Sequence, residues 1–504
     1  MADTKREIER KYEGPAADGG TRMPDLSGVP GVAGVVDKGV AELDATYYDT
    51  PDQRLATASL TLRRRTGGSD AGWHLKLPVA DGVRDEIQAP LSDTVPRAIA
   101  GLVRSRVRDA DLVPLVRLRS ARDIRHLVDD SGALLAEVSL DRVRADRLGG
   151  GGGTAEWTEL EVELADDGDP AFLDKVEKKL RKTGLSRSAS PSKLARALGE
   201  TGKRARKKPA PAPDPVTAGD HVLAYLRAQY EAIVDLDPAV RRDLPDSVHS
   251  MRVATRRMRS TFRSYGKILD RDVTDPIGDE LKWLAGELGV DRDQEVLTER
   301  LTESLGLLPR TLLSGPVRTR LRTWAHARHG GSRRRLIAVL DGKRYLALLT
   351  ALDALVTGPP LLKAAGGDPA KVIAKAVRKD FGTVAGLVEE ALDRPPGADR
   401  DHAMHEARKK AKRTRYAAEA AAPALGGPAA GLVKSMKSLQ GLLGDHQDSV
   451  MTRGALRELA ALAHAAGESS FTYGVLYGRE ERRAAEAEAA LPGAWETIRA
   501  QSAP

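Results

Sequence analysis

The sequence predicts an α+β multidomain protein, with a strand-rich domain at the N-terminus and an all-helical domain at the C-terminus. Apolar residues alternate with polar ones up to about residue 199, whereas from about residue 219 they recur every three or four residues. The stretch 200–218 between these halves is first basic and then rich in proline and alanine. Such a stretch cannot build a core, so we expect domains at 1–199 and 219–504 joined by a linker at 200–218.

The composition limits the kinds of protein that this chain can be. Its 504 residues include no cysteine, which excludes disulfides, thiolate metal sites and cysteine nucleophiles. No apolar run reaches the roughly 18 residues needed to span a bilayer, and the first residues lack the apolar stretch of a signal peptide. We therefore expect a cytoplasmic protein with no membrane partner. The formal charge of +8 favours a polyanionic partner.

The segment 6–13, REIERKYE, places Glu7, Glu9 and Lys11 at alternate positions. Residues two apart share a face of a β-strand, so both carboxylates and the ammonium group lie on one side of the sheet. Such a face can hold a divalent cation and contact an anion at once. The alternative is an edge strand that turns its charged side to water.

Several later strands also have one ionic and one apolar face. Their ionic positions are Arg63 and Arg65, His74 and Lys76, Arg117 and Arg119, and finally Glu159, Glu161 and Glu163. If the sheet curls so that these faces line its interior, acids and bases share a confined lumen. Clustered carboxylates there favour Mg²⁺ or Mn²⁺, and arginine and lysine favour phosphate oxygens. An open sheet with its polar side in water is the alternative.

The helical half contains an internal duplication. The segment HSMRVATRRMR, which starts at His249, recurs as HEARKKAKRTR at His405, 156 residues later. An aspartate motif recurs at nearly the same offset, since Asp293 and Asp448 are 155 residues apart. Two independent landmarks indicate two copies of one helical unit, which we expect to face each other as pseudo-symmetric halves of a bundle.

Each copy contains a helix with a basic stripe on one side and apolar residues on the other. The stripes consist of His249, Arg252, Arg256, Arg259 and Arg263 in the first copy and His405, Arg408, Lys412 and Arg415 in the second. They carry almost no acid, so like charges one turn apart repel, and a bound polyanion would offset that repulsion. A solvated basic face is the alternative. Metal binding by the two histidines is disfavoured, because guanidinium groups surround them.

The first half resembles the CYTH domain of the triphosphate tunnel metalloenzyme family. The motifs that carry the resemblance are Glu7-x-Glu9-x-Lys11, YYDTPDQRL (47–55), LTLRRRTGG, GWHLKLP, LAEVSLDRV, WTELEVEL and SPSKLARAL (190–198). They cover nearly all of residues 1–199 in the expected order. The resemblance implies a closed, eight-stranded antiparallel β tunnel that hydrolyses inorganic or organic triphosphates with divalent metal, while a few family members are nucleotide cyclases.

Carried over by position, the resemblance also implies roles for individual residues. The Glu7, Glu9 and Lys11 motif would be catalytic. Metal ions would be held by Glu7, Glu9, Glu161 and Glu163, with Glu159 as a further candidate. The triphosphate would be bound by Lys11, Arg63, Arg65, Lys76, Arg84, Arg117, Arg119 and Lys193.

The duplicated half resembles the CHAD domain, a polyphosphate-binding module of two four-helix bundles that is often fused to CYTH domains in bacteria. This resemblance implies phosphate contacts from both basic stripes. The two domains together imply an inorganic triphosphatase or short-chain polyphosphatase, dependent on Mg²⁺ or Mn²⁺, whose helical domain binds inorganic polyphosphate or places the enzyme at polyphosphate granules.

Other functions remain open on the sequence alone. The protein could bind polyphosphate without turnover, or act as a nucleotide cyclase or an organic triphosphatase. Nucleic acid would suit the charge, but the basic helices lack aromatic residues interleaved for base stacking, so we do not expect a nucleic-acid partner. The preferred triphosphate, the preferred metal and the oligomeric state are not indicated.

Overall fold

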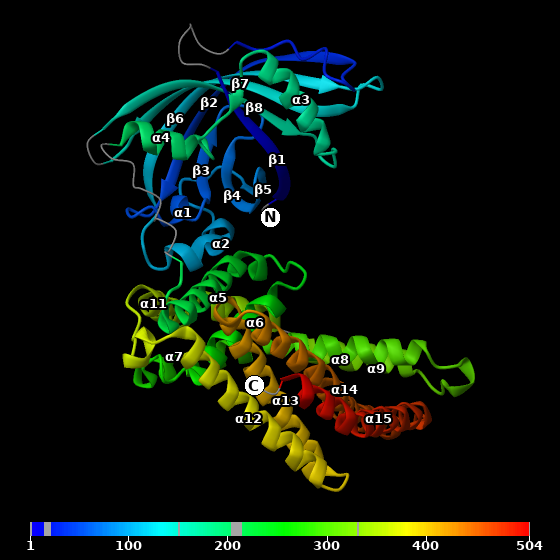
Figure 1. The fold of residues 1–504 in the computed structure, drawn as a ribbon. Coiled ribbons are helices and arrows are strands. Elements are labelled where there is room, and N and C mark those ends of the chain that lie inside the picture. The colour runs from blue at the N-terminus through cyan, green and yellow to red at the C-terminus, as the bar shows by residue number, and fades with distance from the viewer. Residues whose placement is uncertain (1–2, 15–21, 150–151, 203–213, 330–331, 503–504) are drawn as a thin grey trace. The chain divides into compact units, whose positions relative to one another are not determined.

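The computed structural model describes residues 3–14, 22–149, 152–202, 214–329 and 332–502. The chain divides into two compact units, residues 1–212 and 213–504 (Figure 1). Within the described residues of both units, no helix combines the length and the apolar character needed to cross a membrane.

In the described part of the first unit, eight long strands form one antiparallel barrel (Figure 1). They are β1 (Asp3–Glu13), β2 (Gly34–Asp49), β3 (Thr61–Thr66), β4 (Gly72–Ala80), β5 (Val83–Ala89), β6 (Val113–Val128), β7 (Leu134–Arg147) and β8 (Thr154–Leu164). Their order is β5-β4-β3-β2-β6-β7-β8-β1, and β5 also pairs with β1, so the sheet closes on itself. A two-residue strand, β9 (Ser186–Arg187), extends the pairing at the end of β1. The expected eight-stranded tunnel is confirmed.

Helices cover the outer face of the barrel, where the apolar sides of the strands need burial. They are α1 (Arg54–Thr57), α2 (Arg97–Val107) and α3 (Ala171–Lys182), whereas a fourth helix, α4 (Lys193–Thr201), packs on the inner face at one end of the barrel. Leu102 and Val103 of α2 pack on the outer apolar side of β3 to β5, and Phe172 and Val176 of α3 pack on that of β1, β7 and β8. The alternation of the sequence predicts the strands but not these helices.

The inner face of the barrel is apolar at one end and charged elsewhere. At the apolar end, Leu194 and Ala197 of α4 pack with Leu118 of β6, Val143 of β7 and Trp157 of β8. Farther along the same strands the inward side chains are ionic. Helix α4 therefore fills one end of the lumen, and the charged part begins at its first residue, Lys193.

The second unit is helical. Its helices are α5 (Ala218–Arg241), α6 (Ser247–Ser264), α7 (Arg271–Glu287), α8 (Gly289–Gly306), α9 (Val317–His329), α10 (Ser332–Asp341), α11 (Lys343–Thr357), α12 (Pro369–Asp393), α13 (Ala398–Leu425), α14 (Gly427–Ala465) and α15 (Phe471–Ser502). One core joins α5, α6, α7 and α11, and another joins α12 to α15. A third core joins α8 and α9 to the end of α14 and the start of α15.

The order of the helices matches the duplication seen in the sequence. Helices α5, α6, α7 with α8, and α9 correspond in turn to α12, α13, α14 and α15. The long helix α14 is continuous where α7 and α8 are separated at Leu288. Helices α6 and α13, which carry the two basic stripes, pack against each other.

Candidate functional site

The opening strand supplies four charged side chains to the lumen. Lys5, Glu7, Glu9 and Lys11 occupy alternate positions of β1 and all line one cavity of about 370 Å³. Strand pairing sets Glu9 opposite Glu163 of β8. Glu7 and Glu9 are 4% and 7% exposed, so both carboxylates of the opening motif face inward rather than toward water.

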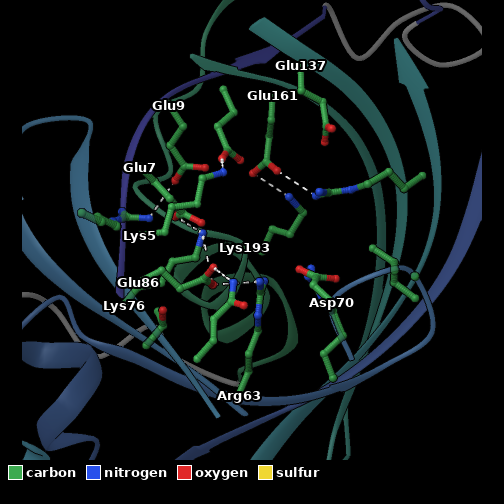
Figure 2. A pocket seen from close by; sticks show the side chains of 18 of the residues that line it. Lys5, Glu7, Glu9, Arg63, Asp70, Lys76, Glu86, Glu137, Glu161 and Lys193 are labelled. Carbon is green, nitrogen blue, oxygen red and sulfur yellow. Dashed lines mark hydrogen bonds and ion pairs between the residues drawn. The ribbon is translucent and has the colours of Figure 1, made fainter. Parts of the chain in front are cut away.

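Figure 2 shows side chains from strands on all sides of the barrel that point toward one another inside it. Glutamates on β1, β5, β7 and β8 face lysines and arginines from β1, β3, β4 and α4. The ionic residues that line the cavity are Lys5, Glu7, Glu9, Lys11, Arg63, Arg65, Asp70, Lys76, Arg84, Glu86, Arg122, Glu137, Glu161, Glu163, Asp166 and Lys193. The lumen therefore combines both signs of charge in one enclosed space.

One group of contacts centres on Glu161. Its carboxylate receives the ammonium groups of Lys11 and Lys193, the latter at 2.6 Å, and the guanidinium of Arg122 at 2.9 Å. Lys193 also lies 2.9 Å from Asp141 and 2.8 Å from Glu159. Burial is expensive for ions unless they are paired, and here three carboxylates share three cations.

A second group centres on Glu86 of β5. His74 Nδ1 lies 3.0 Å from its Oε1, and Arg63 Nη2 lies 3.3 Å from the same oxygen. Lys76 lies 3.8 Å from Glu86 and 2.5 Å from Glu7, so it links the two carboxylates. His74 Nε2 also faces the backbone oxygen of Asp70 at 2.9 Å, which holds the imidazole in place.

The carboxylates in the lumen differ in their pKa values. Burial raises the pKa of Glu7 to about 7, although Lys76 opposes the shift. Burial acts in the same direction on Glu9, but Lys11 and Lys76 outweigh it and hold the pKa of Glu9 at about 2. Likewise Lys11 and Lys193 outweigh burial at Glu161 and keep its pKa well below the ordinary value. At neutral pH, Glu9 and Glu161 are thus charged while Glu7 is in its titration range.

Most of the residues expected in the tunnel come together there. Glu7, Glu9, Lys11, Arg63, Arg65, Lys76, Arg84, Glu161, Glu163 and Lys193 all line the cavity. Glu159 is buried beside it, held by Lys193 and by the indole of Trp157 at 2.7 Å. Glu163 lies nearer solvent and pairs with Lys5 at 2.6 Å.

Arg117 and Arg119 correct the sequence-based expectation, because the structure places them on the outer face of β6. Their side chains are 47% and 51% exposed and pair with Asp44 and Asp146. Their position lies at the apolar end of the barrel, where the inward face of β6 carries Leu118. At this end the ionic face of the strand is therefore the outer one.

The arginine that β6 does supply to the lumen is Arg122, which the motifs do not reveal. Arg122 donates to Asp141 at 2.7 and 2.8 Å, and Asp141 is fully buried. Glu86 is likewise absent from the sequence-based prediction, because the segment 83–89 is not predicted as a strand. The alternation of Arg84, Glu86 and Gln88 on β5 is the signal that could have found it.

The lumen carboxylates suit a hard divalent cation, which prefers oxygen ligands. Oxygens of the buried residues Asp141, Glu159 and Glu161 lie within 4.8 Å of one another, so this cluster could hold a metal ion. Lys11 contacts both Glu9 and Glu161, which shows that cationic charge is already favoured between these strands. Among the described residues, the other expected ligands, Glu7, Glu9 and Glu163, do not belong to so compact a group.

The second unit carries a basic surface where α6 and α13 meet, formed by Arg252, Arg256, Arg408, Lys412 and Arg415. Burial together with Arg408, Arg256 and Arg252 lowers the pKa of Lys412 to about 8. Burial also lowers the pKa of Arg256, and Arg252 and Arg415 add to that shift. The five cations are thus close enough to repel one another.

The remaining residues of the two stripes lie differently. Arg263 is exposed, and the charged neighbours that affect Arg259 are Arg263 and Asp279. His249 is exposed, whereas His405 Nδ1 contacts Gln447 Oε1 at 2.7 Å. Asp448 lies 4.0 Å from Arg408, and the side chain of Asp293 is outside the described residues.

Two glycines let arginines of the basic surface lie against helix backbone. A Cβ on Gly289 of α8 would meet the guanidinium of Arg252 at 2.7 Å, and one on Gly444 of α14 would meet that of Arg408 at 3.2 Å. Gly289 and Gly444 occupy equivalent places in the two copies, as do the two arginines. Both copies therefore contain the arginine and also the glycine against which its guanidinium lies.

Comparisons with known proteins find relatives of this chain. The uncharacterized protein Rv2226 of Mycobacterium tuberculosis is 38% identical over 505 residues, which cover 96% of this chain and 95% of that protein. Thiamine-triphosphatase of Homo sapiens is 40% identical over 84 residues, which cover 16% of this chain and 31% of that enzyme.

Two solved structures are similar to parts of the chain. PptA from Streptomyces chartreusis has a TM-score of 0.47 and 22% identity, covering 56% of this chain and all of that one. The CHAD domain from the plant Ricinus communis has a TM-score of 0.43 and 22% identity, covering 57% of this chain and 92% of that one. Family models match residues 5–198 as a CYTH domain and residues 224–457 as a CHAD domain. The chain therefore belongs to the CYTH family through its barrel and to the CHAD family through its helical unit.

Proposed function

We propose that the barrel hydrolyses inorganic triphosphate or short polyphosphate with Mg²⁺ or Mn²⁺, and that the helical unit binds inorganic polyphosphate. The main support is the lumen, where buried carboxylates and cationic side chains from neighbouring strands share one cavity. A phosphate chain with bound divalent cation carries both signs of charge and matches such a site.

The charge pairs inside the lumen suggest how substrate is accommodated. Lys11 and Lys193 now pair with Glu161, and Lys193 also pairs with the neighbouring carboxylates of Asp141 and Glu159. A bound divalent cation would compensate those carboxylates and the phosphate tail, and it would lower the pKa of a coordinated water. The two ammonium groups would then be available to phosphate oxygens, alongside Arg63, Arg65, Lys76 and Arg122.

Glu7 is the best candidate to accept the proton of the attacking water. Burial holds the pKa of Glu7 at about 7, which suits a general base at neutral pH. His74 is less suited, because both of its ring nitrogens already face oxygen acceptors.

The test is phosphate release from tripolyphosphate, ATP, thiamine triphosphate and long-chain polyphosphate, with and without Mg²⁺ or Mn²⁺. We expect tripolyphosphate to be cleaved best, and a Glu7→Gln, Glu9→Gln variant to be inactive. Preferred cleavage of thiamine triphosphate would support the organic substrate named for the human relative. Formation of cyclic AMP from ATP would support a cyclase, and no release above background would support a binding protein without turnover.

Binding by the helical unit rests on the basic surface of α6 and α13, whose like charges a polyanion would offset. Competition between polyphosphate and DNA at matched salt tests this part separately, and we expect polyphosphate to win. If replacement of these basic side chains abolishes association with polyphosphate granules, that result would support a role of the helical unit in placing the enzyme there.

A further inference from the structure

A second cluster of potential metal ligands lies in the helical unit, outside both sites described above. It consists of Asp401 on α13, His446 on α14 and Glu488 on α15, whose ligand atoms lie within 4.8 Å of one another. His446 is 1% exposed, and the side chains of Asp401 and Glu488 are 27% and 16% exposed. The imidazole is thus buried, with the two carboxylates between it and solvent.

The contacts of His446 do not have the geometry of hydrogen bonds. Its Nε2 lies 3.2 Å from Asp401 Oδ1 and 3.4 Å from Glu488 Oε1. Because these contacts lack that geometry, neither ring nitrogen of His446 has a hydrogen-bond partner among the described residues. In a tetrahedral zinc site with bonds of about 2.1 Å, neighbouring ligand atoms are about 3.4 Å apart. The two observed separations are close to that value.

Two arginines hold the opposite oxygens of the same carboxylates. Arg453 Nη2 lies 3.7 Å from Asp401 Oδ2, and Arg400 Nη1 lies 3.3 Å from Glu488 Oε2. In each carboxylate the arginine approaches one oxygen and leaves the other to face His446. Groups that contact metal-binding carboxylates from behind commonly orient them in this way.

We propose that His446 Nε2, Asp401 Oδ1 and Glu488 Oε1 bind a divalent transition-metal cation, with Zn²⁺ the best match. An imidazole nitrogen favours zinc over magnesium and calcium, which prefer ligand sets made of oxygen alone. The exposed side of the two carboxylates leaves room for water as a further ligand. The cation would join α13, α14 and α15, so its role is to fix these helices to one another.

This site belongs to the second copy of the duplicated unit. The aspartate motif aligns Asp293 with Asp448, and the residue equivalent to His446 is then Asp291. The inference does not depend on catalysis in the barrel or on polyphosphate binding.

The test is calorimetric titration of the metal-free, full-length protein with ZnCl₂ in excess MgCl₂, which competes with zinc for oxygen-only sites such as the lumen carboxylates. We expect one tight zinc equivalent in the wild type, weakened at least about a hundredfold in His446→Gln. His464 lies on the same helix and is exposed, so His464→Gln should bind zinc as the wild type does. Zinc should raise the melting temperature of the wild type and of His464→Gln, but not that of His446→Gln.

Equal zinc stoichiometry and affinity in the wild type and His446→Gln would overturn the proposal. Because His446 is buried, Glu488→Gln provides a second variant of unchanged size, and circular dichroism of the metal-free proteins shows whether both are folded. Titration of the wild type with Co²⁺ needs no variant. The visible absorption bands of four- or five-coordinate Co²⁺ would support the proposal, and the absence of these bands would contradict it.

Discussion

Lys193 Nζ lies 2.6 Å from Glu161 Oε1 and also contacts Asp141 and Glu159. One ammonium group, at the first residue of α4, thus contacts three buried carboxylates on β7 and β8. The next residue, Leu194, packs into the apolar end of the barrel. A single turn of helix therefore sets the boundary between the packed and the charged parts of the lumen.

Replacement of Lys193 by methionine should destabilise the barrel by about 3–5 kcal/mol at pH 7, because it removes one of the three cations that three buried carboxylates share. Lys193 and other cations hold the pKa values of Asp141 and Glu161 below the ordinary value against the effect of burial. Such groups contribute stability above their unfolded pKa, and the contribution is lost as pH falls. The defect should therefore shrink on acidification.

Urea denaturation of the full chain at pH 7 and at about pH 4 measures this effect. The control is Lys175→Met on α3, since that side chain is exposed. Equal loss of stability in both variants, or a defect that grows toward acid, would contradict the assigned role of Lys193.

Arg122 and Arg119 lie on opposite faces of β6, so a variant of the outward Arg119 is a matched control for a variant of the inward Arg122. Arg122→Gln should lower kcat/KM for tripolyphosphate by at least about a hundredfold, because a buried charge-assisted contact is lost. Arg119→Gln should stay within about twofold of the wild type, since exposed ion pairs contribute little. Steady-state kinetics measure both, with thermal melting to separate misfolding from loss of contact. A larger effect at Arg119 would mean that the inward face of β6 has been wrongly assigned.

Polyphosphate binding should weaken as pH rises through about 8. In the free protein, burial and neighbouring cations lower the pKa of Lys412 to about 8, so its ammonium group loses its proton above that pH. A polyanion favours the charged form, and binding should therefore take up protons at pH 8. Calorimetry in two buffers of different ionisation enthalpy measures that uptake. Lys412→Arg stays charged and should abolish it, and unchanged uptake in this variant would point to another group.

Gly444→Ala should weaken polyphosphate binding about tenfold, because its Cβ would press on the guanidinium of Arg408 at 3.2 Å. Gly441 lies on the same helix, and a Cβ there would meet nothing within 4 Å, so it is the control. Gly441→Ala should leave affinity unchanged and add about 0.5–1 kcal/mol of stability, as alanine does in a helix. Equal affinities in the two variants, measured by titration, would show that the position of Arg408 does not matter.

Much of the barrel can be predicted from its strands. The alternation in 6–13 and in 157–164 predicts that Glu7, Glu9, Lys11 and Glu161 share faces of strands, and the structure brings those faces together. The repeated offset between His249 and His405 likewise matches the order of the helices. The segment 83–89 is harder to identify because Asp85 interrupts its apolar face, which is why Glu86 is missing from the predicted site.

The sequence by itself determined which side chains share a face of each strand and which cations share a side of α6 and α13, because the periods of 2 and 3.6 residues are local properties of the backbone. Only the tertiary structure decided which face points inward. Arg119 and Arg122 are three residues apart and so lie on opposite faces of β6. The face that carries Leu118 and Arg122 is the inward one, and there Leu118 packs with Leu194 of α4. The meeting of Asp401, His446 and Glu488 from three helices was also decided there, since no local pattern links residues so far apart in the chain.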